Sequence, residues 1–272
     1  MQLDLRTCCA RFVRRLLTPR HIGAAAALAA MLFFTADSLA APINYGDFDD
    51  IPPGAVMYLD VTESSATDPT PLYGEPDVLV NTIDFDPLEF AAVSTGLGPL
   101  DITDGQLNFT VMTVPGAGLD SFFFSEGGDY SLSGLGGIGT SVSASLSVRV
   151  EILEVDNEPL PAPIVLVDSD FFYNDLDLSG GPTGLKFWDL DVFMDFGPAI
   201  DFLDPELGVT KAEVAIDNQL TANSQRNSGA FIAKKDFKGV PGGDLDPNEI
   251  PEPTAAVLLL TGVFGVSARR RR

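Results

Sequence analysis

Cysteine and histidine are nearly absent from this sequence of 272 residues, which holds two cysteines and one histidine. All three lie near the N-terminus, as Cys8, Cys9 and His21. If that segment is removed, the remaining chain has neither residue type. Disulfide bridges, thiol nucleophiles, Cys/His zinc sites and catalytic triads that need an imidazole are then excluded.

Basic residues are also scarce in the middle of the chain. Between residues 41 and 250, 7 Lys and Arg stand against 36 Asp and Glu. Such an acidic segment repels nucleic acid and anionic lipid surfaces, so no nucleic-acid partner is expected. It attracts cations, above all hard divalent ions that prefer oxygen ligands. A second interpretation is that the charge only keeps an extracellular protein soluble.

The motifs of several enzyme classes are missing as well. The sequence contains no Gly-x-Ser-x-Gly, no phosphate-binding loop and no dinucleotide-binding fingerprint. A carboxylate pair for glycoside hydrolysis is not excluded by residue type. With so many acids, however, no particular pair is indicated, so the sequence favours a protein without enzymatic activity.

The N-terminus has the pattern of a secretory signal peptide. Five arginines within residues 6–20 are followed by an apolar run over residues 22–34. Small residues at Ser38 and Ala40 occupy the two positions that a signal peptidase inspects, which predicts cleavage before Ala41. The alternative is an N-terminal anchor that stays uncut, but the apolar run is short for a membrane-spanning helix.

The C-terminus combines three features in a fixed order. Pro251, Glu252 and Pro253 come first, followed by an apolar run over residues 254–268 and a cluster of arginines. The arginines are Arg269, Arg270, Arg271 and Arg272. The prolines end any preceding structure, and the apolar run is expected to form a transmembrane helix. The arginines stay on the cytoplasmic side, which leaves the body of the chain outside the membrane.

This tail resembles the PEP-CTERM sorting signal, in which Pro-Glu-Pro precedes a short apolar helix and a C-terminal arginine cluster. The resemblance covers residues 250–272 only. It implies recognition by exosortase, an intramembrane transpeptidase-like enzyme of bacteria that make exopolysaccharide. It further implies a transient inner-membrane tether, cleavage near Pro-Glu-Pro and delivery to the envelope surface or extracellular matrix. A plain single-pass anchor is the alternative, although the apolar run is shorter than the usual span of about 20 residues.

The body of the chain shows the alternation typical of half-buried strands. The clearest case is Ser141–Ile152, where aliphatic residues alternate with Ser, Arg and Glu. Further strands are expected at residues 56–62, 107–114, 121–125, 164–167, 212–216 and 230–233. Long loops are expected at residues 62–76 and 156–163.

Turns rich in Gly and Pro separate these strands, and no stretch has a sustained helical period. The pattern predicts an all-β fold, an antiparallel β-sandwich that is jelly-roll-like. One domain is preferred over two small sandwiches that meet near residues 158–163. The predicted organisation is a signal peptide at 1–40, the sandwich at 41–245, and a linker with the transmembrane sorting helix at 246–272.

The densest group of acids is a candidate calcium site. Asp168, Asp170, Asp175 and Asp177 lie close together in the sequence, and Ca²⁺ accepts about six to eight oxygen ligands. The spacing is not that of an EF-hand, because aromatic residues at 171–173 interrupt it. The alternative is a set of acids at strand ends that face water, in which case the protein binds no cofactor.

Three aromatic residues are candidates to stack on a sugar, namely Phe187, Trp188 and Phe193, although aromatics in alternating strands are usually buried. The sequence as a whole predicts an exported, non-enzymatic protein of the cell surface or exopolysaccharide matrix. Two alternatives are kept: a secreted carbohydrate-active enzyme with a carboxylate pair, and a calcium-dependent sugar-binding module. The expected partners are signal peptidase, an exosortase-type enzyme, the membrane and exopolysaccharide.

Overall fold

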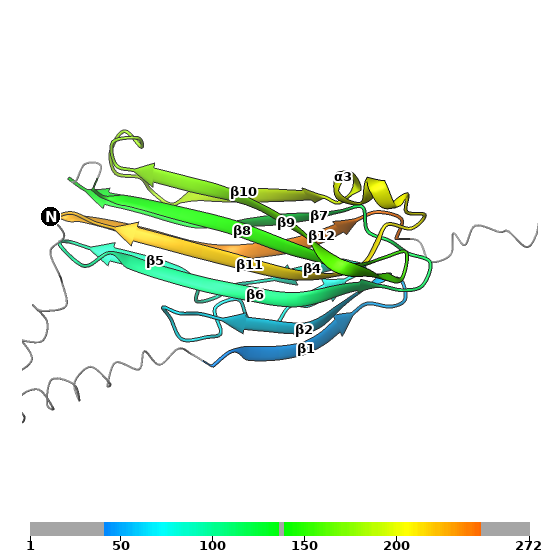
Figure 1. Ribbon diagram of the computed structural model, residues 1–272. Coiled ribbons are helices and arrows are strands. Elements are labelled where there is room, and N and C mark those ends of the chain that lie inside the picture. The colour runs from blue at the N-terminus through cyan, green and yellow to red at the C-terminus, as the bar shows by residue number, and fades with distance from the viewer. Residues whose placement is uncertain (1–40, 136–138, 246–272) are drawn as a thin grey trace, which may run out of the picture. The chain divides into compact units, whose positions relative to one another are not determined.

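The computed structural model describes residues 41–135 and 139–245, which form two antiparallel β-sheets packed face to face (Figure 1). The predicted signal peptide at 1–40 lies outside the described residues, as does the predicted linker with its sorting tail at 246–272. Within the described residues, no helix combines the length and the apolar character that crossing a membrane requires.

Sheet A has the strand order β1-β2-β6-β11-β8-β9. Its strands are β1 (Ile43–Asp49), β2 (Val56–Ser64), β6 (Asp101–Thr113), β8 (Ser141–Val155), β9 (Glu158–Asp175) and β11 (Val209–Asn223). Sheet B has the order β10-β7-β12-β4-β3, and β5 also pairs with β12. Its strands are β3 (Asp77–Leu79), β4 (Thr82–Phe85), β5 (Ala91–Thr95), β7 (Ser121–Gly134), β10 (Lys186–Asp195) and β12 (Ser228–Gly242). Two short helices, α3 (Gly197–Ile200) and η1 (Asp201–Leu203), connect β10 to β11.

The alternation in β8 predicts its burial correctly. Its aliphatic residues from Val142 to Ile152 at every second position are at most 1 % exposed, while the intervening residues face away from the core. The same alternation places the side chains of Leu107, Phe109 and Val111 of β6 in the core. The inward faces of both sheets form one apolar core, which confirms the predicted all-β sandwich. The jelly-roll-like class stays a prediction.

The long loop predicted at residues 156–163 is wrong. Asp156 and Asn157 both have positive φ, 55° and 64°, and they join β8 to β9 as a two-residue hairpin. Such a hairpin needs positive φ at both positions, which Asp and Asn adopt more readily than most other residues with a side chain. β9 therefore begins directly at Glu158.

Proline-rich sequence also suggested a boundary between two small sandwiches near residues 158–163. Instead, this segment lies inside β9, and Pro159, Pro161 and Pro163 alternate along the strand. β9 is the edge strand of sheet A and pairs only with β8. Prolines are compatible with such a strand, because positions whose backbone groups face the free edge donate no ladder hydrogen bond.

The loop predicted at residues 62–76 is present from residue 65, because β2 extends to Ser64, and a buried carboxylate shapes it. Glu63 accepts hydrogen bonds from the backbone N–H groups of Leu72, Tyr73 and Gly74, the last two at 3.2 and 3.3 Å. It also accepts the hydroxyl of Tyr45 at 2.7 Å. By satisfying these buried donors, Glu63 fixes the backbone where the Tyr73 ring enters the core.

Candidate functional site

The four acids predicted as calcium ligands have separate environments. Asp168 and Asp170 are exposed on β9, and Asp170 accepts the backbone N–H of Asp191 in β10 at 3.1 Å. Asp175 is buried, and its oxygens accept the N–H of residue 178 at 2.7 Å and the hydroxyl of residue 173 at 3.1 Å. Asp177 is exposed in the turn that follows.

Within the described part of the chain, the one group of three carboxylates that lie close enough for a metal ion is Asp84, Asp86 and Asp236. A lysine already pairs with two of them. The ammonium of Lys238 lies 3.5 Å from a carboxylate oxygen of Asp84 and 3.1 Å from one of Asp236. Desolvation raises the pKa of Asp84, while Lys238 acts in the opposite direction. The ion pairs with Lys238 therefore explain why these carboxylates lie close together.

The outer face of sheet A carries a groove of about 410 Å³. Its polar lining comes from β2, β6, β8 and β11 and consists of Asp60, Thr62, Asn108, Thr110, Arg149, Glu151 and Glu213. Arg149 donates a hydrogen bond to Glu151, and Glu151 lies directly opposite Glu213 on the neighbouring strand. The groove therefore offers a cation, carboxylates, an amide and hydroxyls to a polar ligand.

Exposed side chains of β9 extend this face beyond the groove. Val167, Phe171 and Tyr173 are 64, 62 and 45 % exposed. Val167 lies opposite Arg149 of the groove wall, and Phe171 lies opposite Ser145. Residues that are directly opposite in an antiparallel pair share one face of the sheet. The two aromatic rings of β9 therefore lie on the same face as the groove.

The three aromatics that the sequence marked for sugar contact lie elsewhere. Trp188 is buried, and its indole N–H donates to the carbonyl of Ala233 at 3.1 Å. Phe187 and Phe193 are 81 and 58 % exposed on β10. They belong to sheet B, whose outer face lies on the other side of the sandwich from the groove.

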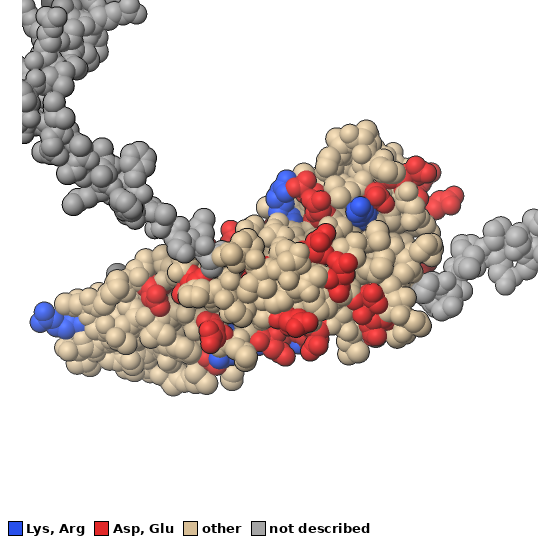
Figure 2. Space-filling model, turned by 90° about the horizontal axis from the view of Figure 1, so that it is seen from below, with Lys and Arg blue, Asp and Glu red and all other residues tan. Residues whose placement is uncertain are grey.

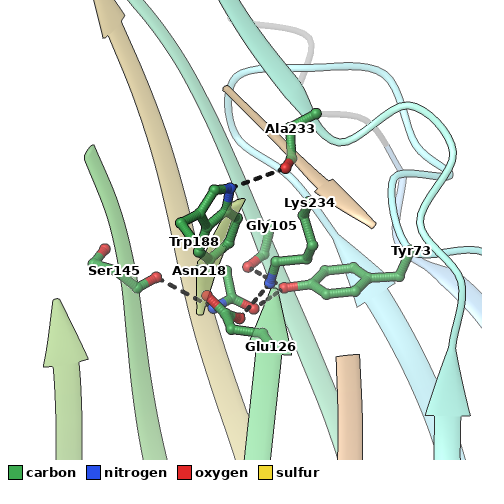
Figure 3. Close-up of polar contacts among 8 residues, drawn as sticks. All are labelled: Tyr73, Gly105, Glu126, Ser145, Trp188, Asn218, Ala233 and Lys234. Atoms are coloured by element: carbon green, nitrogen blue, oxygen red, sulfur yellow. Dashed lines mark hydrogen bonds and ion pairs between the residues drawn. The ribbon is translucent and has the colours of Figure 1, made fainter. Parts of the chain in front are cut away.

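A second candidate site lies in the core between the two sheets (Figure 3). Lys234 of β12 and Glu126 of β7 come from sheet B, whereas Asn218 of β11 comes from sheet A. The side chains of Lys234 and Glu126 are fully buried, and Asn218 is 0 % exposed. Each of the three occupies an inward position in a strand whose other inward residues are mostly apolar.

These polar side chains meet at one carboxylate oxygen. Glu126 Oε2 accepts hydrogen bonds from Lys234 Nζ at 2.5 Å and from Asn218 Nδ2 at 2.6 Å. Asn218 Nδ2 also donates to the carbonyl of Ser145 at 3.2 Å, and Asn218 Oδ1 accepts the hydroxyl of Tyr73. Glu126 Oε1 has no hydrogen-bond partner among the described residues. All the partners of this carboxyl group are thus gathered on one side.

Aromatic rings surround the lysine. Its Nζ lies 5.0, 4.9 and 5.3 Å from the ring centroids of Tyr73, Phe90 and Phe237. Desolvation lowers the pKa of Lys234 to about 8, although Glu126 attracts its charge. Desolvation also raises the pKa of Glu126. Both shifts favour the uncharged amine and the uncharged acid.

Sequence reasoning missed this site, although the strand pattern contained a signal for it. In β7, Glu126 follows the buried Phe122 and Phe124 at the next alternate position, so its side chain lies on the same inward face. In β12, Lys234 lies two residues after the buried Ile232, and its side chain is on the same inward face. A polar residue at an inward position of an alternating strand marks a buried polar contact, because such groups require partners.

No protein-family model matches the chain, and no curated protein matches it. A solved structure of TmCBM61 with β-1,4-galactotriose is 8% identical, with a TM-score of 0.21, and the match covers 72% of this chain and 87% of that one. A carbohydrate-binding module specific for non-crystalline cellulose is 8% identical, with a TM-score of 0.21, over 59% of this chain and 76% of that one.

A loop-swap mutant of Xyn11A from Necallimastix patriciarum is likewise 8% identical, with a TM-score of 0.24, over 74% of this chain and 100% of that one. At such TM-scores these likenesses carry no argument about what this chain binds or does.

Proposed function

We propose that the outer face of sheet A binds a neutral polysaccharide, and that the chain acts as a non-enzymatic protein of the cell surface or extracellular matrix. The observation that carries this proposal is that the polar groove and the exposed rings of Phe171 and Tyr173 lie on the same sheet face. Sugar rings present apolar faces and polar hydroxyl edges. A surface that combines aromatic rings with hydrogen-bonding groups is complementary to both.

The acidic surface restricts the ligand. Figure 2 shows Asp and Glu side chains spread over the face that it presents, with few Lys or Arg. An acidic polysaccharide would be repelled by such a field, whereas a neutral one would not. Hydroxyl groups of a neutral sugar donate well to carboxylates such as Glu151 and Glu213 in the groove.

Replacing Phe171 or Tyr173 by alanine is expected to weaken polysaccharide binding about tenfold, because an aromatic contact contributes about 0.5–1.5 kcal/mol beyond its buried area. Isothermal titration of the full chain with soluble β-glucan, xylan and galactan measures the change. Phe187→Ala is the matched control, since it removes an exposed phenylalanine from sheet B. Equal losses for all three variants, or no binding at all, would contradict the proposal.

The same polysaccharides test the two alternatives. Glu151 and Glu213 face each other across neighbouring strands, and a glycosidase requires two carboxyl groups on either side of the scissile bond. Release of reducing sugar that Glu213→Gln abolishes would establish the enzyme and refute a non-enzymatic role. Binding that a chelator abolishes would instead establish the calcium-dependent module.

The route of export is a separate part of the proposal. The signal-peptide pattern at 1–40 and the PEP-CTERM-like tail at 251–272 support delivery through the inner membrane to the surface or matrix. In a host that has an exosortase, deletion of residues 251–272 is expected to shift the protein from the surface fraction into soluble fractions. Cell fractionation and immunoblotting measure this. An unchanged distribution would show that the tail is not the sorting signal.

A further inference from the structure

We propose that Lys234 and Asn218 become joined by an intramolecular isopeptide bond in the core, with Glu126 transferring the protons. The inference is independent of polysaccharide binding. It rests on a primary amine and a carboxamide that both donate a hydrogen bond to the same carboxyl group between the two sheets. Figure 3 shows these groups pointing toward one another, with the hydroxyl of Tyr73 beside them.

The reacting groups are held in place before any reaction. Lys234 Nζ and Asn218 Nδ2 share one partner, Glu126 Oε2, at 2.5 and 2.6 Å. The amine therefore lies beside the carboxamide of Asn218. β7 and β12 pair with each other in sheet B, and β11 pairs with β6 and β8 in sheet A. Because the packed sheets hold all three strands, the three side chains do not have to be brought together by diffusion. Such positioning removes a large part of the free-energy barrier that a bimolecular reaction would face.

The surroundings favour the reactive protonation states. An amine attacks a carbonyl carbon only when it is unprotonated. Burial lowers the pKa of Lys234 and raises that of Glu126, and both shifts favour transfer of a proton from the ammonium to the carboxylate. The three aromatic rings around Nζ exclude water, which would otherwise solvate the charged pair.

The reaction balances without a further reactant. Lys234 Nζ attacks Asn218 Cγ, a new C–N bond forms, and negative charge develops on Asn218 Oδ1. The hydroxyl of Tyr73 already donates to that oxygen and stabilises the charge. Glu126 accepts a proton from Nζ and delivers one to Nδ2. The Cγ–Nδ2 bond then breaks, ammonia leaves, and a secondary amide joins the two side chains.

The product would connect the two sheets covalently, because Asn218 lies on β11 of sheet A and Lys234 on β12 of sheet B. No disulfide can link the two sheets in this way, because the sequence has no cysteine after Cys9. A bond of this kind would keep the sandwich closed in an extracellular setting. Glu126 is left as an uncharged acid in the core, where no ammonium remains to pair with it.

Tryptic peptide mapping of the full chain by mass spectrometry tests the proposal. Trypsin does not cut after a lysine whose amine is acylated. We therefore expect peptide 212–226, which contains Asn218, joined to peptide 227–235, which contains Lys234 in uncut form. The joined mass should be lower than the sum of the two peptides by one ammonia. Linear peptides 212–226 and 227–234 from the folded chain would overturn the proposal, as would aspartate at 218 without a joined peptide.

Variants assign the roles. Glu126→Gln keeps the size of the side chain but removes the proton-transferring acid, and it should leave at least tenfold less joined peptide. Asn218→Ala should leave none. Lys235→Ala is the matched control, because Lys235 is the exposed neighbour of Lys234, and it should retain the bond in full. A joined peptide of equal yield in Glu126→Gln would refute the role of Glu126. Peptide mapping of the unaltered chain decides whether the bond forms at all, so this result does not depend on whether the variants fold.

Discussion

Replacing Lys234 by alanine is expected to lower the free energy of unfolding by about 3–5 kcal/mol, since breaking a buried ion pair leaves its partner uncompensated. In the unbonded chain that the structure describes, Glu126 would stay in the core without the ammonium that lies 2.5 Å away. The truncation also empties the space among the rings of Tyr73, Phe90 and Phe237. For a domain of this size the melting temperature should fall by about 10 °C.

Lys235→Ala is the control for this measurement. Lys235 follows directly in β12 but is exposed, so its loss should change stability by less than about 0.5 kcal/mol. Urea denaturation followed by tryptophan fluorescence gives both values, because the single tryptophan, Trp188, is buried beside this site. Equal stability of the two variants would show that the buried pair contributes nothing.

A double variant separates the charge from the proposed bond. Lys234→Met with Glu126→Leu removes both charges and leaves apolar side chains of similar size. If only the ion pair matters, this variant should regain most of the lost stability, because buried pairs are often replaced by apolar residues at little cost. If the isopeptide bond also contributes, the double variant should stay less stable than the unaltered chain.

Replacing Phe122 by alanine is expected to cost about 3–5 kcal/mol as well, through a cavity in the core. Phe122 is fully buried in β7. Its ring stacks on that of Phe124 with centroids 4.4 Å apart, and it packs against Phe109 of the facing sheet at 6.5 Å. The ring therefore lies where the two sheets meet.

Phe123→Ala is the matched control, because the neighbouring residue points to the outer face and is 36 % exposed. Its removal should cost less than about 1 kcal/mol. Thermal and urea denaturation of the two variants compare an inward with an outward phenylalanine at adjacent positions. A larger loss for Phe123→Ala would mean that the register of β7 is shifted by one residue, since such a slip exchanges the two faces.

Much of the fold was predictable because alternation is a local property of an extended chain. The residues from Val142 to Ile152 in β8 are buried at every second position, as their pattern indicates. The error at residues 156–163 had a tertiary cause. Whether a proline-rich segment is a loop or a strand depends on its place in the sheet, and here β9 occupies an edge.

Sites were less predictable than strands. Asp168, Asp170, Asp175 and Asp177 are close in sequence, but strand direction and turn geometry give them different partners. The groove was equally hidden, because Arg149 and Glu213 belong to strands whose pairing no local pattern specifies.

Composition alone excluded cysteine and histidine chemistry from the part of the chain after His21. Glu126, Asn218 and Lys234 lie just beyond the strands expected at 121–125, 212–216 and 230–233, and they continue the inward alternation of the observed strands. That these three meet was decided by the tertiary structure. Glu126 and Lys234 are 108 residues apart, and Asn218 reaches them from the other sheet. Strand order and sheet packing determine which inward residues touch. Both arise from the collective burial of the core.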